Sequence, residues 1–419
     1  MIKKMMSFID ASPTAFHAIE NVAKMLDDND YARFDEKNAW KLSKTRRGYV
    51  VRNSSSLIAF AIPTGKILGF RVFAAHSDSP AYRIKENAEV PFGDRYVRLN
   101  TERYGGMIQN SWLDRPLSIA GRVIYEDSEG GLAETLINID KDLCVIPNVA
   151  VHMNPDVNKG YEYKAQNDML PLLCEGKPGC FDDMIAKATK VSKDKILGRD
   201  LFVYARQEGT LIGPKKEFVL SPRLDDLACV YAGATAFIDS EYGNYIQVLA
   251  VFDNEEVGSL TKQGADSTFL EDVLYRIAED LSYSRTDYLR LLADSFVISA
   301  DNAHGIHPAM PGKADLTNRP YLNGGVVLKF NGNQRYATDA YSAAFIRQLA
   351  KMCEVDLQDY ANNSDIPGGS TLGNISTGHV SVPTADIGLA QLSMHSAVET
   401  MGAGDEAKLV RLAKAFYEQ

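Results

Sequence analysis

The sequence predicts an α/β protein, with a mixed sheet flanked by helices and a β-rich domain inserted between the two ends of the chain. After residue 219, apolar runs typical of buried strands alternate with helical patterns. From about residue 91 to 218, short strand-like pieces are instead broken by Gly, Asn and Asp turns. A chain of 419 residues is long enough for such an insertion. We therefore expect an α/β domain at 1–90 and 219–419 and an inserted domain at 91–218.

The elements before and within the insertion are marked by short local signals. "SFIDASPTAFHAIENVAKMLDD" predicts one N-terminal helix, with Ser12 as its cap and Pro13 at the first helical position. "SLIAFAI" and "ILGFRVFAAHSDSP" predict strands of the α/β domain. "YVRLN", "LSIAGRVIYE" and "ETLINI" predict strands of the inserted domain.

The elements after the insertion begin with a helix of small residues. "LACVYAGATAFI" follows "SPRLDD", and its Ala and Gly residues allow close approach of another backbone. Strands are then predicted at "YIQVLAVF", "SFVISA", "GGVVLKF" and "TADIGLA". Helices are predicted at "DAYSAAFIRQLAKMC" and the closing "GDEAKLVRLAKAFYE".

Composition excludes several classes of function. The 45 basic and 55 acidic residues give a formal net charge of −10, which disfavours nucleic-acid binding. No apolar run approaches the length of a membrane span, and the N-terminal apolar run is too short for a signal peptide, so we expect a cytoplasmic protein with no membrane partner. The five cysteines are an odd number without a CxxC pair, which indicates free or buried thiols.

Residues able to bind metal follow four predicted strands that are distant in the sequence. In an open α/β sheet such residues gather beyond the carboxyl ends of the strands. A single His or Asp at such a position is usually a core, surface or turn residue. Without a metal site, that ordinary explanation would have to apply to all of these residues at once. The residues concerned are His76, Asp78, Glu255, Glu256, Asp301 and His395.

Two imidazoles and three carboxylates suit a pair of divalent ions with a hydroxide between them. Either Asp225 or Asp226, at the start of the small-residue helix, could add a carboxylate from a fifth segment. Two adjacent glutamates repel each other, and a metal site would give Glu255 and Glu256 separate tasks as ligand and as base. Asp78 lies two residues after His76 and can fix the tautomer of that histidine.

Two further motifs stand close to these residues in the sequence. His304 and His307 in "ADNAHGIHP" are possible ligands, but we expect them to line the site. The glycine-rich "IPGGSTLGN" at 366–374 lacks the lysine of a phosphate-binding loop, so we expect close backbone approach to a substrate, or a turn.

With these residues in view, the chain resembles the aspartyl aminopeptidase family of dinuclear zinc metallopeptidases. The resemblance covers nearly the whole length, and its motifs occur in the family's order. They are "HSDSP", "YGGMIQNSWLDRPLSIAGRV", "IPNVAVHM", "SPRLDDL", "FDNEEVGS", "SADNAHGIHP", "LKFNGNQRYATDA", "PGGSTLG" and "QLSMHS". The chain has Asp226 where many relatives have Asn, and Asn148 where they often have His.

The resemblance implies a role for each site residue. Glu255 would be the general base and Asp78 the partner of His76, while Asp225 would bridge two divalent ions, zinc or alternatively cobalt or manganese. The implied metal ligands are His76, Asp225, Glu256, Asp301 and His395. The implied substrate-binding residues are Lys329, which would attract an acidic side chain, together with Tyr336, His304 and Gly369.

The resemblance also implies how the protein works and assembles. Relatives remove an N-terminal residue, commonly Asp or Glu, from peptides. Their inserted domain forms a dimer, and dimers assemble into a tetrahedral dodecamer. His152 would reach across the dimer to the partner's substrate. Three alternatives remain: a broad or leucine-preferring aminopeptidase of the same fold, a hydrolase of another substrate such as an N-acyl group, and a non-catalytic assembly or cargo-binding protein.

Overall fold

The computed structural model describes all residues from Met1 to Gln419, and the chain forms two compact units. The first unit consists of Met1–Asp78, Gly209–Met394 and Glu399–Gln419. The second unit consists of Ser79–Glu208 and His395–Val398. We expected the insertion to begin at residue 91, but β5 (Ala81–Phe92) is one continuous strand of the second unit.

A mixed sheet of 13 strands forms the centre of the first unit, as predicted. Its main path runs through β1 (Ala32–Phe34), β2 (Arg47–Arg52), β3 (Ser56–Ala61), β13 (Ile246–Phe252), β4 (Phe70–His76), β14 (Phe296–Ala300), β18 (Thr384–Leu392), β19 (Glu399–Gly402), β12 (Phe218–Ser221) and β11 (Thr210–Ile212). Off this path, β15 and β16 pair with β18, and β17 pairs with β16. These three strands are β15 (Ala303–His304), β16 (Val326–Phe330) and β17 (Leu357–Ala361).

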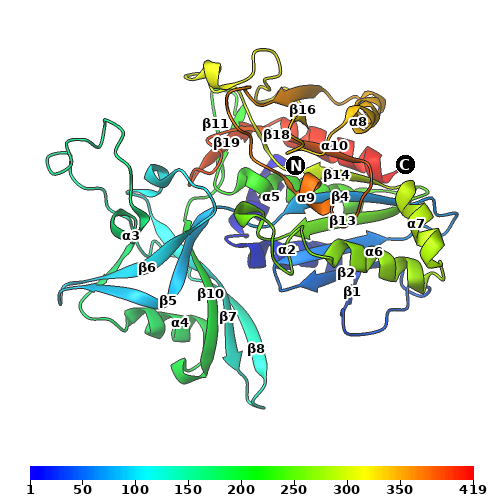
Figure 1. The fold of residues 1–419 in the computed structure, drawn as a ribbon. Helices are drawn as coiled ribbons and strands as arrows, with labels where there is room; N and C mark the ends of the chain where they lie inside the picture. The colour runs from blue at the N-terminus through cyan, green and yellow to red at the C-terminus, as the bar shows by residue number, and fades with distance from the viewer. The chain divides into compact units, whose positions relative to one another are not determined.

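Helices cover both faces of this sheet (Figure 1). Alternate residues of β3 show the two faces, since Leu57 and Ala59 belong to one apolar cluster and Ile58 and Phe60 to the other. The first cluster includes side chains of α1 (Ile2–Asp10), α2 (Ala15–Asp27), α5 (Leu224–Asp239), α8 (Ala340–Met352) and α10 (Asp405–Tyr417). The second includes side chains of α6 (Phe269–Asp280), α7 (Arg285–Ala293) and α9 (Leu372–Ser376).

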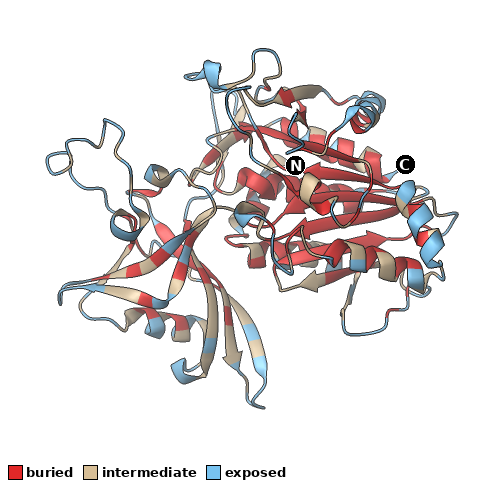
Figure 2. Cartoon of the chain, in the orientation of Figure 1, coloured by how far each residue is buried: buried red, intermediate tan, exposed pale blue.

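Four neighbouring parallel strands, β13, β4, β14 and β18, are buried almost throughout (Figure 2). Their continuous apolar runs follow from this, because helices cover both faces. Phe252 pairs with His76, so the carboxyl ends of β13 and β4 lie side by side. The sheet therefore brings residues that follow these strands to one edge.

The small-residue helix lies where its composition predicted close packing. α5 packs against β4 and β13, and nearly all its residues are buried. A Cβ atom added to Gly233 would lie 2.6 Å from ring atoms of Phe73, so only glycine allows the helix to approach β4 this closely.

The second unit is built on a six-stranded antiparallel sheet. Its strand order is β8 (Leu132–Asn138), β7 (Leu117–Glu126), β10 (Ile196–Ala205), β5, β6 (Tyr96–Tyr104) and β9 (Leu172–Glu175). Phe181 and Ile185 of α4 (Cys180–Thr189) are buried in the unit's own apolar cluster. The short α3 (Ala165–Asp168) also belongs to this unit.

The single N-terminal helix expected from the sequence is wrong, because the segment forms two helices. α1 ends at Asp10, and α2 begins at Ala15 with Thr14 at its N-cap. Ser12 does not cap α2, since its hydroxyl donates back to the carbonyl of Phe8 at 2.7 Å.

The five cysteines are all free thiols, as their odd number indicated. Among the helices, none combines the length and the apolar character needed to cross a membrane.

Candidate active site

The candidate ligands of the first unit lie where three parallel strands end. His76 is the last residue of β4, and Asp301 directly follows β14. Glu255 and Glu256 lie in a 3-10 turn, Glu255–Val257, that follows β13. Because β13, β4 and β14 are adjacent and parallel, these residues meet at one edge of the sheet.

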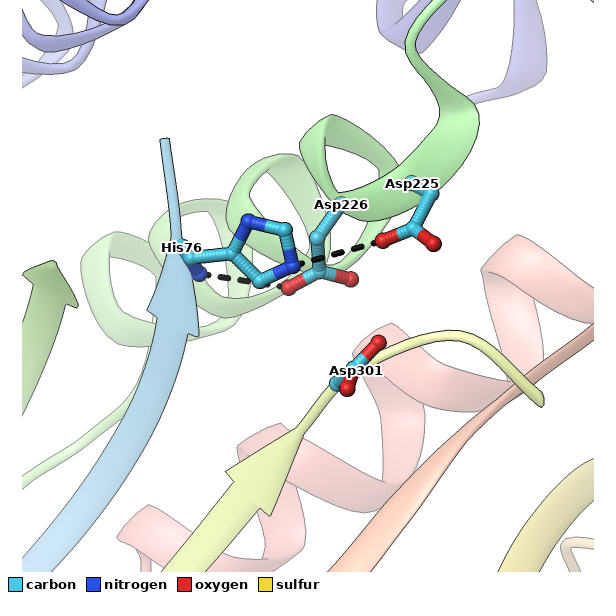
Figure 3. Close-up of side chains that lie close together, drawn as sticks. All are labelled: His76, Asp225, Asp226 and Asp301. Atoms are coloured by element: carbon cyan, nitrogen blue, oxygen red, sulfur yellow. Dashed lines mark hydrogen bonds and ion pairs between the residues drawn. The ribbon is translucent and has the colours of Figure 1, made fainter. Parts of the chain in front are cut away.

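Asp225 and Asp226 reach the same place from the start of α5 (Figure 3). Both have non-helical backbone angles and both are buried, so the first turn of α5 points its carboxylates inward. Asp225 Oδ1 lies 3.3 Å from His76 Nε2. Asp226 Oδ2 accepts a hydrogen bond from the backbone amide of His76 at 3.2 Å.

The candidate side chains within the first unit form two overlapping groups. In the first, His76, Asp225, Asp226 and Asp301 each offer one ligand-type atom, and these atoms lie within 4.8 Å of one another. In the second, His76 is grouped in the same way with Glu255 and Glu256. The structure thus brings together candidates from four separate segments of the chain.

Several carboxylates are buried close together in this cluster, and both their burial and their mutual repulsion raise their pKa values. Burial raises the pKa of Glu255 to about 8, and the nearby charges of Asp301 and Asp78 act in the same direction. Burial also raises the pKa values of Glu256 and Asp226 well above their ordinary values. For His76, burial lowers the pKa, but the carboxylates of Asp225 and Asp78 outweigh it and the pKa is raised. A cation bound close by would therefore stabilise the ionised carboxylates of this cluster.

Asp78 connects the histidine to both glutamates. His76 Nδ1 lies 3.1 Å from the carbonyl oxygen of Asp78 and 3.4 Å from its Oδ1. The same carboxylate accepts the backbone amides of Glu255 at 3.1 Å and Glu256 at 3.2 Å. With Nδ1 held by Asp78, His76 directs Nε2 towards Asp225.

The donor set fits divalent metal ions. Carboxylate oxygens and imidazole nitrogen are ligands that zinc, cobalt and manganese all accept. Asp226 Oδ1 is buried and has no hydrogen-bond partner, which is costly for a carboxylate oxygen unless a cation is bound close by. The residues of the first unit that could hold such ions are His76, the two aspartates of α5, Asp301, Glu255 and Glu256.

Lys329, on β16, is buried beside this cluster. Its Nζ donates to the carbonyl of Asn302 at 2.9 Å and lies 3.5 Å from Asp301 Oδ2. It also lies 5.4 Å from the ring centre of Tyr336. Lys329 is therefore a close cationic partner of Asp301.

Of the other predicted substrate-binding residues, His304 is the last residue of β15, and Tyr336 and Gly369 lie on the loops that follow β16 and β17. The ring of His304 is exposed and packs edge-on against Tyr360, with 6.3 Å between ring centres. His307 is also exposed, and its Nδ1 accepts the amide of Ala309. Gly369 is exposed, and a Cβ atom built on it would meet nothing within 4 Å, so its backbone faces open space.

Two predicted site residues belong to the second unit. His395 lies three residues beyond the end of β18 and opens the segment His395–Val398. Its carbonyl accepts the amide of Ile108 at 3.0 Å, within the same unit. His152 is exposed in a turn outside the unit's strands and helices.

The family described as aminopeptidase I zinc metalloprotease (M18) matches residues 8–417. The chain belongs to the M18 family. A "Probable M18 family aminopeptidase 2" of Clostridium novyi is 41% identical, covering 99% of this chain and 98% of the relative. One of the same name from Pseudomonas aeruginosa is 39% identical, covering 99% and 97%.

Solved M18 structures have the same fold. The Ape4 chain of an Ape4–Nbr1 complex has a TM-score of 0.94 at 32% identity, covering 100% of this chain and 85% of Ape4's chain. The Saccharomyces cerevisiae mApe1 dodecamer has a TM-score of 0.88 at 26% identity, covering 100% and 96%. This M18 chain is therefore a metallo-aminopeptidase, a hydrolase of peptides, and the predicted family is confirmed.

Some residues that shape this M18 site carry no signal in the sequence. Glu399, on β19, is buried, and its Oε2 accepts the backbone amide of Asp225 at 3.1 Å. Asn302 donates to the carbonyl of Leu224, which precedes Asp225. Both fix the start of α5, but Glu399 is 174 residues away in the sequence and resembles an ordinary surface glutamate there.

Proposed function

We propose that this M18 aminopeptidase removes N-terminal residues, preferentially Asp or Glu, from peptides with the help of two zinc ions. The observation that carries this proposal is the convergence of a buried histidine and several carboxylates at the strand ends, beside a second glutamate that can act as a base. The proposed ligands are His76, Asp225, Glu256, Asp301 and His395, with Asp225 bridging the ions.

When bound, two such ions lower the pKa of a water molecule and polarise the scissile carbonyl group. We assign the proton transfer to Glu255, which accepts a proton from the attacking water and passes it to the leaving amine. Asp78 supports this step, because its carboxylate holds the amide of Glu255.

We include His395 among the proposed ligands because of the strand that it follows. It follows β18, which is the parallel neighbour of β14, and β14 leads directly to Asp301. Residues that follow adjacent parallel strands emerge at the same edge of a sheet. Imidazole is also a common zinc ligand, which suits a second histidine in this set.

The preference for acidic residues rests on Lys329. It is a buried cation beside Asp301 and Tyr336, and the proposed substrate-binding residues Tyr336 and Gly369 lie on the neighbouring loops. A compact ammonium group with three donors can donate to a substrate carboxylate in addition to the carbonyl of Asn302.

We also propose a homo-oligomer in which the second unit forms dimers and His152 reaches the partner's substrate. Support comes from the relative mApe1, whose solved structure is a dodecamer. A tetrahedral arrangement of dimers would produce the same number of subunits here. The exposure of His152 leaves its imidazole available to another subunit.

The decisive experiment is removal and return of the metal. Protein treated with a chelator should lose all aminopeptidase activity, and zinc, cobalt or manganese should restore it. The activity should be measured on chromogenic Asp, Glu, Leu and Ala substrates, with bound metal counted by elemental analysis.

Each result of this experiment has a clear reading. Full activity in metal-free protein would contradict the metal-dependent mechanism. A restored enzyme that prefers Leu would replace the acidic preference by the broad or leucine-preferring alternative. Loading with two ions per chain but no activity on any peptide would favour the non-catalytic alternative.

A further inference from the structure

A buried aspartate outside the metal cluster joins two loops of the first unit. Asp386 lies on β18, fully buried, and pairs in the sheet with Ser299 of β14. One loop, residues 331–339, connects β16 to α8 and carries Tyr336. The other, residues 362–371, connects β17 to α9 and carries Gly369. These are the two loops that carry proposed substrate-binding residues.

Asp386 makes three short hydrogen bonds to these loops. Its Oδ2 accepts the backbone amide of Ala337 at 2.6 Å. Its Oδ1 accepts the hydroxyl of Thr371 at 2.6 Å. Its own backbone amide donates to Thr338 Oγ1 at 2.8 Å. We call this arrangement, made of Asp386, Ala337, Thr338 and Thr371, the Asp386 clamp.

Gly373, in the first turn of α9, lies close to this carboxylate. A Cβ atom added to Gly373 would lie 2.6 Å and 2.7 Å from the two carboxylate oxygens of Asp386. Any side chain at Gly373 would therefore displace the carboxylate or the loop. This gives one glycine of "PGGSTLG" a defined task, which is to admit Asp386.

A fully buried carboxylate is costly unless its oxygens are hydrogen-bonded. The Asp386 carboxylate accepts hydrogen bonds from both loops, so it is best satisfied when both loops are docked on β18. The clamp therefore couples the two loops, because the docking of one loop on β18 favours the docking of the other.

The clamp lies close in sequence to the proposed substrate-binding residues. Ala337 is the residue after Tyr336, whose ring lies under Lys329 Nζ, and Lys329 contacts Asp301. Thr371 follows Gly369 by two residues. We propose that Asp386 is a positioning residue that holds the loops of Tyr336 and Gly369 together as one substrate-binding wall. This inference rests on the proposed function, in which those two residues contact the substrate.

The test removes one bond of the clamp with little change of volume. Thr371→Val lacks the hydroxyl that Asp386 accepts, whereas Thr371→Ser keeps it. We expect Thr371→Val to raise KM on the best aminoacyl substrate by about tenfold, with kcat within about twofold and an unchanged metal content. Thr371→Ser should restore KM to near the wild-type value.

Two further variants separate positioning from general damage. Thr101→Val, at a buried threonine of the second unit whose hydroxyl has no partner, should leave KM and kcat unchanged. Asp386→Asn can still accept from Ala337 and can donate to Thr371, so it should raise KM less than Asp386→Ala does. This second pair tests the clamp even if Thr371→Val does not fold.

The outcomes distinguish the clamp from the proposed function. If wild-type protein with restored metal hydrolyses no peptide substrate, the proposed function fails. If wild type is active but Thr371→Val keeps the wild-type KM, the positioning role is overturned. A fall in kcat together with loss of metal would likewise overturn it, since Asp386 would then be supporting the metal cluster instead.

Discussion

Asp78 Oδ1 accepts the backbone amide of Glu255 at 3.1 Å, although the two residues are 177 positions apart. The other oxygen of Asp78 accepts the amide of Glu256, and His76 Nδ1 lies close to Asp78 as well. One aspartate thus holds both His76, a proposed ligand, and the turn that carries both glutamates. Its effect goes beyond the tautomer of His76, which was the only task the sequence indicated.

Replacing Asp78 by Asn should therefore disturb metal binding and turnover together. An amide has one acceptor oxygen and cannot accept both backbone amides as a carboxylate does. We expect Asp78→Asn to weaken metal affinity by about 10- to 100-fold, measured by calorimetry on chelator-treated protein. Asp200→Asn, which removes a carboxylate paired with Arg122 in the second unit, is the control. Equal affinity in wild type and Asp78→Asn would exclude this role.

The adjacent glutamates should respond differently to the same substitution. Glu255→Gln should keep both metal ions but lose at least about 10²-fold in turnover, because the proton shuttle is removed. Glu256→Gln should lower the number of ions bound, since it removes a ligand. Elemental analysis and steady-state kinetics on the same samples check both, with Glu279→Gln on the exposed side of α6 as control. The opposite pattern would exchange the two assignments.

Lys329→Met should reveal whether the buried lysine recognises substrate. We expect it to lower kcat/KM on N-terminal Asp and Glu far more than on Leu, because only acidic side chains pair with the ammonium. Lys351→Met, at an exposed position on α8, should change none of the three. An equal loss on all three substrates would instead make Lys329 a structural partner of Asp301, which lies 3.5 Å from its Nζ.

His152 should act in a neighbouring subunit. His152→Ala should reduce kcat more than it changes KM, because an imidazole N–H that stabilises an oxyanion matters mainly in the transition state. Mixing and reassembling His152→Ala with Glu255→Gln should create some sites with an intact base and an intact partner histidine. Activity should then exceed the sum of the two parents. Mixed assemblies of verified mass that recover no activity would rule out the trans role.

The convergence of the candidate site residues could be predicted because many of them occupy positions that local patterns define. His76, Glu255, Glu256 and Asp301 each follow an apolar run, and a buried parallel strand has a recognisable end in the sequence. The ordered motifs then indicated the family. The N-terminal helices were harder to predict, because serine is a common N-cap residue. Ser12 instead donates its hydroxyl to the carbonyl of Phe8, near the end of α1.

The sequence by itself determined the fold class, the family and the strand ends at which the candidate ligands gather, because periodicity and motif order are local properties of the chain. Only the tertiary structure decided which groups, distant in the sequence, contact those residues and the loops beside them. Asp78 holds the glutamates, Lys329 is buried against Asp301, and Asp386 joins two loops. Each of these contacts pairs segments that are far apart in sequence, and a residue's local pattern contains no information about the partner that folding will bring to it.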